Sequence, residues 1–135
     1  MNLMVKTCNY DAMNTQRIFA RGFVVAGGIF WVAAAFGAMN AYLGKTIAQS
    51  VMTALVPLAL AVVVFLVGWF YERLASLILA IGAVVVIVWG VLGAWEMGVW
   101  LTMGVFLIAP IAISALLYLL AAQTQTVCEL STAKK

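Results

Sequence analysis

Residues 51–92 read VMTALVPLALAVVVFLVGWFYERLASLILAIGAVVVIVWGVL and contain two charged side chains, the adjacent Glu72 and Arg73. As one α-helix these 42 residues would extend about 60 Å at ~1.5 Å per residue. That is about twice the ~30 Å hydrocarbon core of a bilayer. Burying either charge at the membrane centre would also cost about 2.5–3.5 kcal/mol. A reversal of the chain at Glu72-Arg73 removes both problems, so this stretch predicts a hairpin of two membrane-spanning helices.

The composition of the whole chain also indicates that lipid is its solvent. The chain has 135 residues, of which 67% are hydrophobic and 8% are charged, and its mean hydropathy is +1.19. An ordinary soluble domain carries about 25% charged residues, and no soluble fold of this size has an interior large enough to hide so much apolar surface. The basic residues form no stripe interleaved with aromatic residues, so we expect no nucleic-acid partner.

Short polar intervals divide the remaining apolar sequence into two further spans. The four predicted helices cover about residues 18–43, 51–70, 74–92 and 99–121. We therefore predict an all-α fold, an integral membrane four-helix bundle made of two transmembrane hairpins. A single membrane domain would cover residues 17–121, between polar tails at residues 1–16 and 122–135.

The basic residues are distributed unequally between the two sides of this bundle. Four spans place both termini and the Glu72-Arg73 turn on one side. Six of the seven basic residues fall on that side: Lys6, Arg17, Arg21, Arg73, Lys134 and Lys135. The opposite side has Lys45 alone. Because cytoplasmic segments are enriched in Lys and Arg, we expect a multi-pass protein of a bacterial cytoplasmic membrane with both termini in the cytoplasm.

Residue types that most catalytic and metal sites require are missing. The chain has no histidine, which removes the usual general base and haem ligand. None of its four carboxylates falls within a predicted span, whereas a proton-coupled transporter needs an ionisable group inside the membrane. Cys8 and Cys128 alone make a zinc site improbable. In a reducing compartment we expect both to be free thiols, with a disulfide between the tails as the alternative. We predict no catalytic residue, cofactor or metal.

Two features of the first span point to binding. Ala33, Gly37 and Ala41 recur every four residues and form a stripe of small side chains that another helix can approach closely. Arg17 and Arg21 are also four residues apart, so they share one helix face just before the apolar stretch Gly22–Leu43. We interpret these arginines as a topology anchor, with binding of an anionic lipid head group as the alternative.

Polar residues in the spans and turns give two further hypotheses. A polar cavity at the membrane midplane, flanked by proline kinks, would be lined by Asn40, Thr53, Thr102 and Ser114. Lys45 and Glu96, in the turns opposite the termini, would pair between the hairpins and contribute about 0.2–1 kcal/mol. On the side of the termini, Glu72 can reach Arg17 or Arg21.

The second predicted span carries a proline and ends in an aromatic-rich Trp-x-x-Glu turn. The pattern comprises Pro57, Trp69-Phe70-Tyr71-Glu72, Ala109-Pro110 and Leu116-Leu117-Tyr118-Leu119-Leu120. It resembles a group of uncharacterised small four-span bacterial membrane proteins, although the first span lacks the aspartate expected towards its outer end. This resemblance implies an architecture and no activity.

These observations favour a non-enzymatic role. We expect an accessory or scaffolding subunit that packs, within the lipid bilayer, on a partner in a larger membrane complex or on copies of itself as a homo-oligomer. The alternative is a small-solute carrier or channel built around the polar cavity. An intramembrane enzyme is the least favoured hypothesis, because the chain lacks both histidine and a carboxylate within a span.

Overall fold

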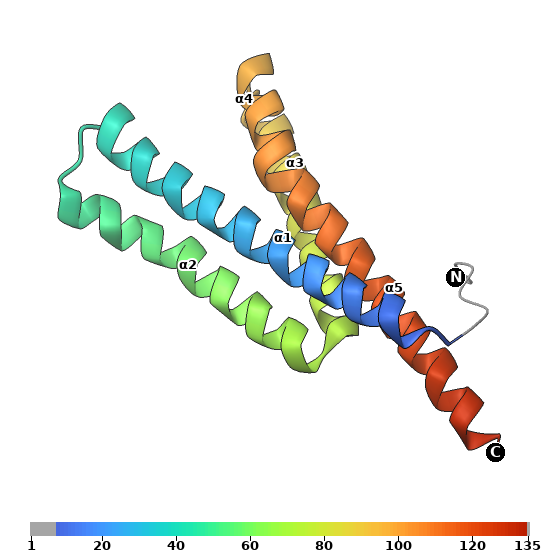
Figure 1. Ribbon diagram of the computed structural model, residues 1–135. Helices are drawn as coiled ribbons and strands as arrows, with labels where there is room; N and C mark the ends of the chain where they lie inside the picture. The colour runs from blue at the N-terminus through green and yellow to red at the C-terminus, as the bar shows by residue number, and fades with distance from the viewer. Residues whose placement is uncertain (1–7, 135) are drawn as a thin grey trace.

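The computed structural model describes residues 8–134, and within this range the chain is helical almost throughout. The segments are α1 (Tyr10–Gly37), η1 (Ala38–Tyr42), α2 (Ile47–Phe70), α3 (Glu72–Leu92), α4 (Met97–Met103), η2 (Gly104–Ile108) and α5 (Ala109–Ala133). The π-helical turn η1 continues α1, and η2 joins α4 to α5 just before Pro110. The result is four long helices, each long and apolar enough to cross a membrane. The predicted all-α pair of helical hairpins is confirmed (Figure 1).

The chain reverses between α2 and α3 at Tyr71, as the charge pattern predicts. The Tyr71 backbone leaves the helical region, with φ −133° and ψ 79°. Its amide donates to the Val67 carbonyl (2.7 Å) and its carbonyl accepts from the Ala75 amide (2.9 Å), so one residue serves both helix ends. Glu72 occupies the first turn of α3, where the helix dipole favours a negative charge.

The loop between η1 and α2 contains a glycine and a helix cap. Gly44 has φ +59°, a left-handed conformation that costs glycine no steric strain. The Thr46 side chain then accepts from the Gln49 amide (3.3 Å), and the Gln49 side chain accepts from the Thr46 amide (3.3 Å). This capping box fixes the start of α2.

Three tryptophans pack together at the turn between α3 and α4. The Trp95 ring lies 5.9 Å from the Trp89 ring and 5.4 Å from the Trp100 ring, measured between centroids. Gly90 makes room for them, because a Cβ there would lie 2.7 Å from the Trp100 ring and 2.8 Å from the Trp95 ring. The cluster holds the second hairpin closed at its loop.

The two hairpins lie together near the chain termini and diverge towards their loops (Figure 1). α1 packs along both α2 and α5, and α5 also packs along α3. We call the end with residues 8–20, Tyr71 and residues 114–134 the termini end. The end with the two hairpin loops, residues 43–46 and 93–96, is called the far end.

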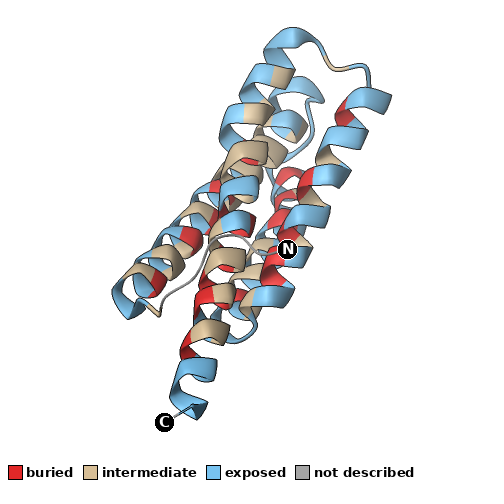
Figure 2. Cartoon of the chain, turned by 90° about the vertical axis from the view of Figure 1, so that its right-hand side faces the viewer, coloured by how far each residue is buried: buried red, intermediate tan, exposed pale blue. Residues whose placement is uncertain are grey.

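The core lies towards the termini end and is built mainly from small residues. Its buried members are Ala20, Val24, Ala75, Leu79, Ala115 and Tyr118. Two buried serines join the helices there: the Ser114 hydroxyl donates to the Ala20 carbonyl (3.0 Å), and the Ser76 hydroxyl donates to the Ala115 carbonyl (2.8 Å). α5 is thereby tied to α1 and α3 at one level, and the buried residues line the inward faces of the helices (Figure 2).

The polar segments that flank the spans are helical wherever the structure describes them. The Asn9 side chain accepts from the Ala12 amide (3.1 Å) and caps α1, which starts at Tyr10, inside the expected tail at residues 1–16. At the other end α5 continues through the expected tail at residues 122–135 as far as Ala133. Lys6 and Lys135, which contribute to the predicted charge bias, lie outside the described residues.

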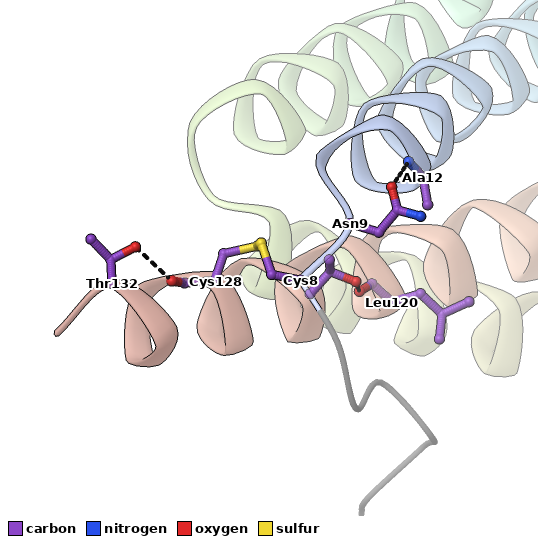
Figure 3. The surroundings of a disulfide bond; sticks show 7 residues. Cys8, Asn9, Ala12, Leu120, Cys128 and Thr132 are labelled. Atoms are coloured by element: carbon purple, nitrogen blue, oxygen red, sulfur yellow. Dashed lines mark hydrogen bonds between the residues drawn. A yellow bond between two sulfur atoms is a disulfide. The ribbon is translucent and has the colours of Figure 1, made fainter. Parts of the chain in front are cut away.

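Cys8 and Cys128 form a disulfide, with their Cα atoms 4.8 Å apart (Figure 3). The expectation of two free thiols is therefore wrong, and the alternative of a bond between the tails describes the structure. Hydropathy did not reveal it because the pairing depends on the polar ends of α1 and α5 continuing as adjacent helices. The bond joins residues 120 positions apart and closes the termini end of the bundle.

Candidate functional site

A half-buried ion pair connects α1 to α3 at the termini end. The Arg17 Nε donates to Glu72 Oε1, and the side chains retain 23% and 9% of their exposure. A second guanidinium nitrogen of Arg17 donates to Gln125 Oε1 on α5 (2.9 Å), and the Gln125 amide donates to Glu129 (2.9 Å). The predicted contact between Glu72 and one of the two arginines is thus confirmed for Arg17.

Arg21 lies one turn further along α1 and has a different environment. Its guanidinium carbon sits 4.1 Å above the centre of the Trp69 ring, in a cation–π contact. Within residues 8–134 it forms no ion pair, and its buried Nε has no hydrogen-bond partner. The two arginines therefore share a helix face, as predicted, but only the charge of Arg17 is neutralised by a carboxylate.

Tyr118, on α5, is the largest fully buried side chain of the described core. Its buried hydroxyl has no hydrogen-bond partner among the described residues. It also fills the space over Gly68, where a Cβ would lie 2.7 Å from the Tyr118 Cζ. Gly68 is therefore required by a close approach of a ring to the α2 backbone. Tyr118 is a core residue, although its place near the end of a predicted span fits an aromatic residue at the membrane boundary equally well.

A groove of about 740 Å³ runs between α1 and α2 on the outside of the bundle. It extends from Val24 and Leu66, nearest the termini end, to Phe36 and Val51 towards the far end, and every side chain that lines it is apolar. α1 and α2 touch along this interface at Gly28, where a Cβ would lie 2.9 Å from the Ala61 Cβ.

The predicted small-residue stripe is not used to join helices of this chain. Ala33 and Ala41 are exposed, and a Cβ added at Gly37 would meet nothing within 4 Å. The close approach of α1 to its neighbours occurs earlier, at Gly27 and Gly28, which face Pro110 and Ala61. The stripe is left open on the surface of the far end.

The four residues of the predicted polar cavity do not meet. Asn40 and Thr102 are exposed, and the side chains of Asn40, Thr53 and Thr102 bond to backbone carbonyls of Lys45, Gln49 and Gly98. Ser114 is fully buried and bonds to α1 instead. The predicted cavity is therefore wrong. The reason is that hydroxyls within apolar helices bond to the nearest carbonyl rather than remain available to a solute.

The predicted pair between Lys45 and Glu96 is also wrong. Within the described range the structure has one ion pair, Arg17–Glu72. Lys45 and Glu96 belong to loops that stand far apart because the hairpins diverge (Figure 1). The spacing of the charges along the chain carried no information about this divergence.

The sequence did not single out Ser76, Trp69 or Tyr118 as contact residues between helices. A polar residue within an otherwise apolar span signals an interhelical hydrogen bond, and Ser76 fits that signal. No comparable signal marks Tyr118, whose burial depends on its placement opposite Gly68. Among residues 8–134 no three of His, Cys, Asp and Glu gather as metal ligands would.

No protein-family model, curated protein or solved structure matches this chain. The fold and the site define a class, a small all-α protein of two apolar helical hairpins joined at one end. The resemblance to small four-span bacterial membrane proteins stays a prediction.

Proposed function

We propose that this chain is an integral protein of a bacterial cytoplasmic membrane and acts as a non-enzymatic accessory or scaffolding subunit. The observation that carries the proposal is the open small-residue stripe. Gly37 has empty space where a side chain would stand, and Ala41 is exposed. Small residues on a membrane-spanning helix allow a second backbone to approach closely. The stripe thus leaves room for the close approach of a helix from a partner or from a second copy.

The carrier or channel hypothesis has no comparable support. Its four polar residues bond to backbone carbonyls at separate places. The groove between α1 and α2 has a purely apolar lining. A polar solute would lose its hydration there without gaining hydrogen bonds.

Association through the stripe can be tested with two matched glycine variants. Gly37→Leu fills the stripe, and Gly82→Leu places the same side chain on α3, where a Cβ also meets nothing within 4 Å. After mild detergent extraction, native mass spectrometry should show the chain bound to a second copy or to another membrane subunit. Gly37→Leu should abolish that association and Gly82→Leu should preserve it. A wild-type chain that is monomeric and carries no other subunit would refute the proposal.

We further propose that both termini lie in the cytoplasm, supported by the excess of basic residues at the termini end. The disulfide favours the opposite orientation, because structural disulfides persist in oxidising compartments. In the proposed orientation Cys8 and Cys128 are reduced in growing cells. Acid trapping followed by maleimide labelling should therefore modify both thiols without prior reductant. A bond that stays closed in cells, with residues near Lys45 protected from a membrane-impermeant reagent, would establish the reverse orientation.

A further inference from the structure

Arg21 and Trp69 lie one helical turn beyond the residues that line the apolar groove, on the side of the termini end. Val25 lines the groove on α1 and lies four residues after Arg21, so both occupy one face of the helix. Phe65 lines the groove on α2 and lies four residues before Trp69, and the two rings are 6.0 Å apart. Because the Arg21 guanidinium rests on the Trp69 ring, the pair closes the groove at the termini end.

This closing pair carries an uncompensated positive charge. Arg17, on the preceding turn, is neutralised by Glu72, but Arg21 has no carboxylate partner in the described chain. Its Nε is buried without a hydrogen-bond acceptor. An arginine presents several N–H donors in a fork that suits phosphate oxygens. The site therefore combines an apolar groove with an anion-binding group at one end.

The dimensions of the groove match one leaflet of a bilayer. Its α1 wall runs from Val24 to Phe36, which corresponds to about 18 Å at ~1.5 Å per residue. One leaflet contributes half of the ~30 Å hydrocarbon core. Trp69 is half-exposed at the end of the groove, and tryptophan prefers the level of the lipid head groups. The charge thus lies where a phosphate would be, and the apolar wall lies where acyl chains would be.

The chemistry of the groove favours an anionic amphiphile over a second apolar helix. Its wall is wholly apolar, and the charge at its end belongs to Arg21, which has no carboxylate partner in the described chain. An apolar helix in the groove would leave that charge without a partner.

We propose that Arg21, Trp69 and the α1–α2 groove form a binding site for an anionic phospholipid, with the phosphate on Arg21 and the acyl chains in the groove. The groove shares Ala33 with the small-residue stripe, but Gly37 and Ala41 do not line it, so the Gly37→Leu test of the subunit role and the Arg21→Gln test of this site address different residues.

The head-group contact can be tested by titrating the purified chain with phosphatidylglycerol or phosphatidylcholine in detergent and counting bound lipids by native mass spectrometry. Arg21→Gln should weaken phosphatidylglycerol binding by about tenfold, as expected for loss of a charged hydrogen bond. Arg21→Lys should retain part of the affinity, because the charge remains. Arg73→Gln is the matched control, since Arg73 lies at the same end, outside the groove, and bonds to Thr126.

The acyl-chain contact can be tested with two adjacent valines of equal exposure. Val62 lines the groove and Val63 does not, and the two are 50% and 53% exposed. Val62→Trp should fill the groove and reduce binding of both lipids, whereas Val63→Trp should leave binding unchanged. This pair keeps the proposal testable even if Arg21→Gln fails to fold.

Two results would overturn the proposal. One is equal affinity for the two lipids that Arg21→Gln does not alter, which would mean ordinary boundary lipid. The other is a dimer that Val62→Trp dissociates while lipid binding is unchanged, which would mean that the groove receives a second copy.

Discussion

The termini end and the far end of this bundle belong to the same four long helices, yet they are held together very differently. At the termini end an ion pair, two interhelical serine bonds and a disulfide connect α1, α3 and α5. At the far end each hairpin is closed by its own loop, and the hairpins stand apart (Figure 1). If the helices lie in a bilayer, as we propose, apolar side chains gain little by leaving lipid for one another, and the few polar contacts then decide where helices join.

The largest expected effect is loss of the disulfide. Cys8→Ser should lower the free energy of unfolding by about 2–4 kcal/mol, because the bond restricts an unfolded chain whose linked residues are 120 positions apart. Reversible unfolding in mixed micelles would measure it. Reductant should destabilise the wild type by the same amount and leave Cys8→Ser unaffected. Equal stability of all these forms would show that the bond does not hold the termini end together.

Glycine substitutions at the two ends should change the free energy of unfolding in opposite directions. Gly68→Ala should cost about 1–3 kcal/mol, because its Cβ overlaps the buried Tyr118 ring. Gly98→Ala at the far end meets nothing within 4 Å and should stabilise α4 by up to about 1 kcal/mol through helix propensity. Thermal unfolding of both variants checks this. A similar shift for both would mean that the two ends are equally packed.

The ion pair at the termini end should show a smaller coupling. A double-mutant cycle of Arg17→Gln and Glu72→Gln should give about 1 kcal/mol, since both side chains are largely withdrawn from solvent. Strictly additive single effects would indicate that the pair is incidental. Either single variant should be less stable than the double variant, because each leaves one charge unpaired.

At the far end a double-mutant cycle of the two loop charges should show no coupling energy. Lys45→Glu and Glu96→Lys should be additive within about 0.5 kcal/mol, because these residues lie in separate loops. Recovery of stability in the double charge reversal would show that the hairpins meet at their loops, as the sequence alone suggested.

The sequence predicted the helices well and their packing poorly. The charged doublet at Glu72-Arg73 located the reversal, because placing charges in hydrocarbon is costly whatever the neighbours are. The divergence of the hairpins depends instead on close contacts such as Gly68 with Tyr118, which hydropathy does not encode. The cavity prediction failed for a related reason, since a hydroxyl such as that of Thr53 is satisfied by its own helix.

The hairpins join at the termini end and separate towards the far end (Figure 1). Distances between spin labels, measured by pulsed electron–electron double resonance on the protein in bilayer nanodiscs, test this arrangement most directly. One pair of labels replaces Arg73 and Thr126, and the other replaces Lys45 and Glu96. Arg73 and Thr126 are hydrogen-bonded, so the first distance should be short. The second distance should be much longer, because Lys45 and Glu96 lie in separate loops at the far end. Two equally short distances would contradict it.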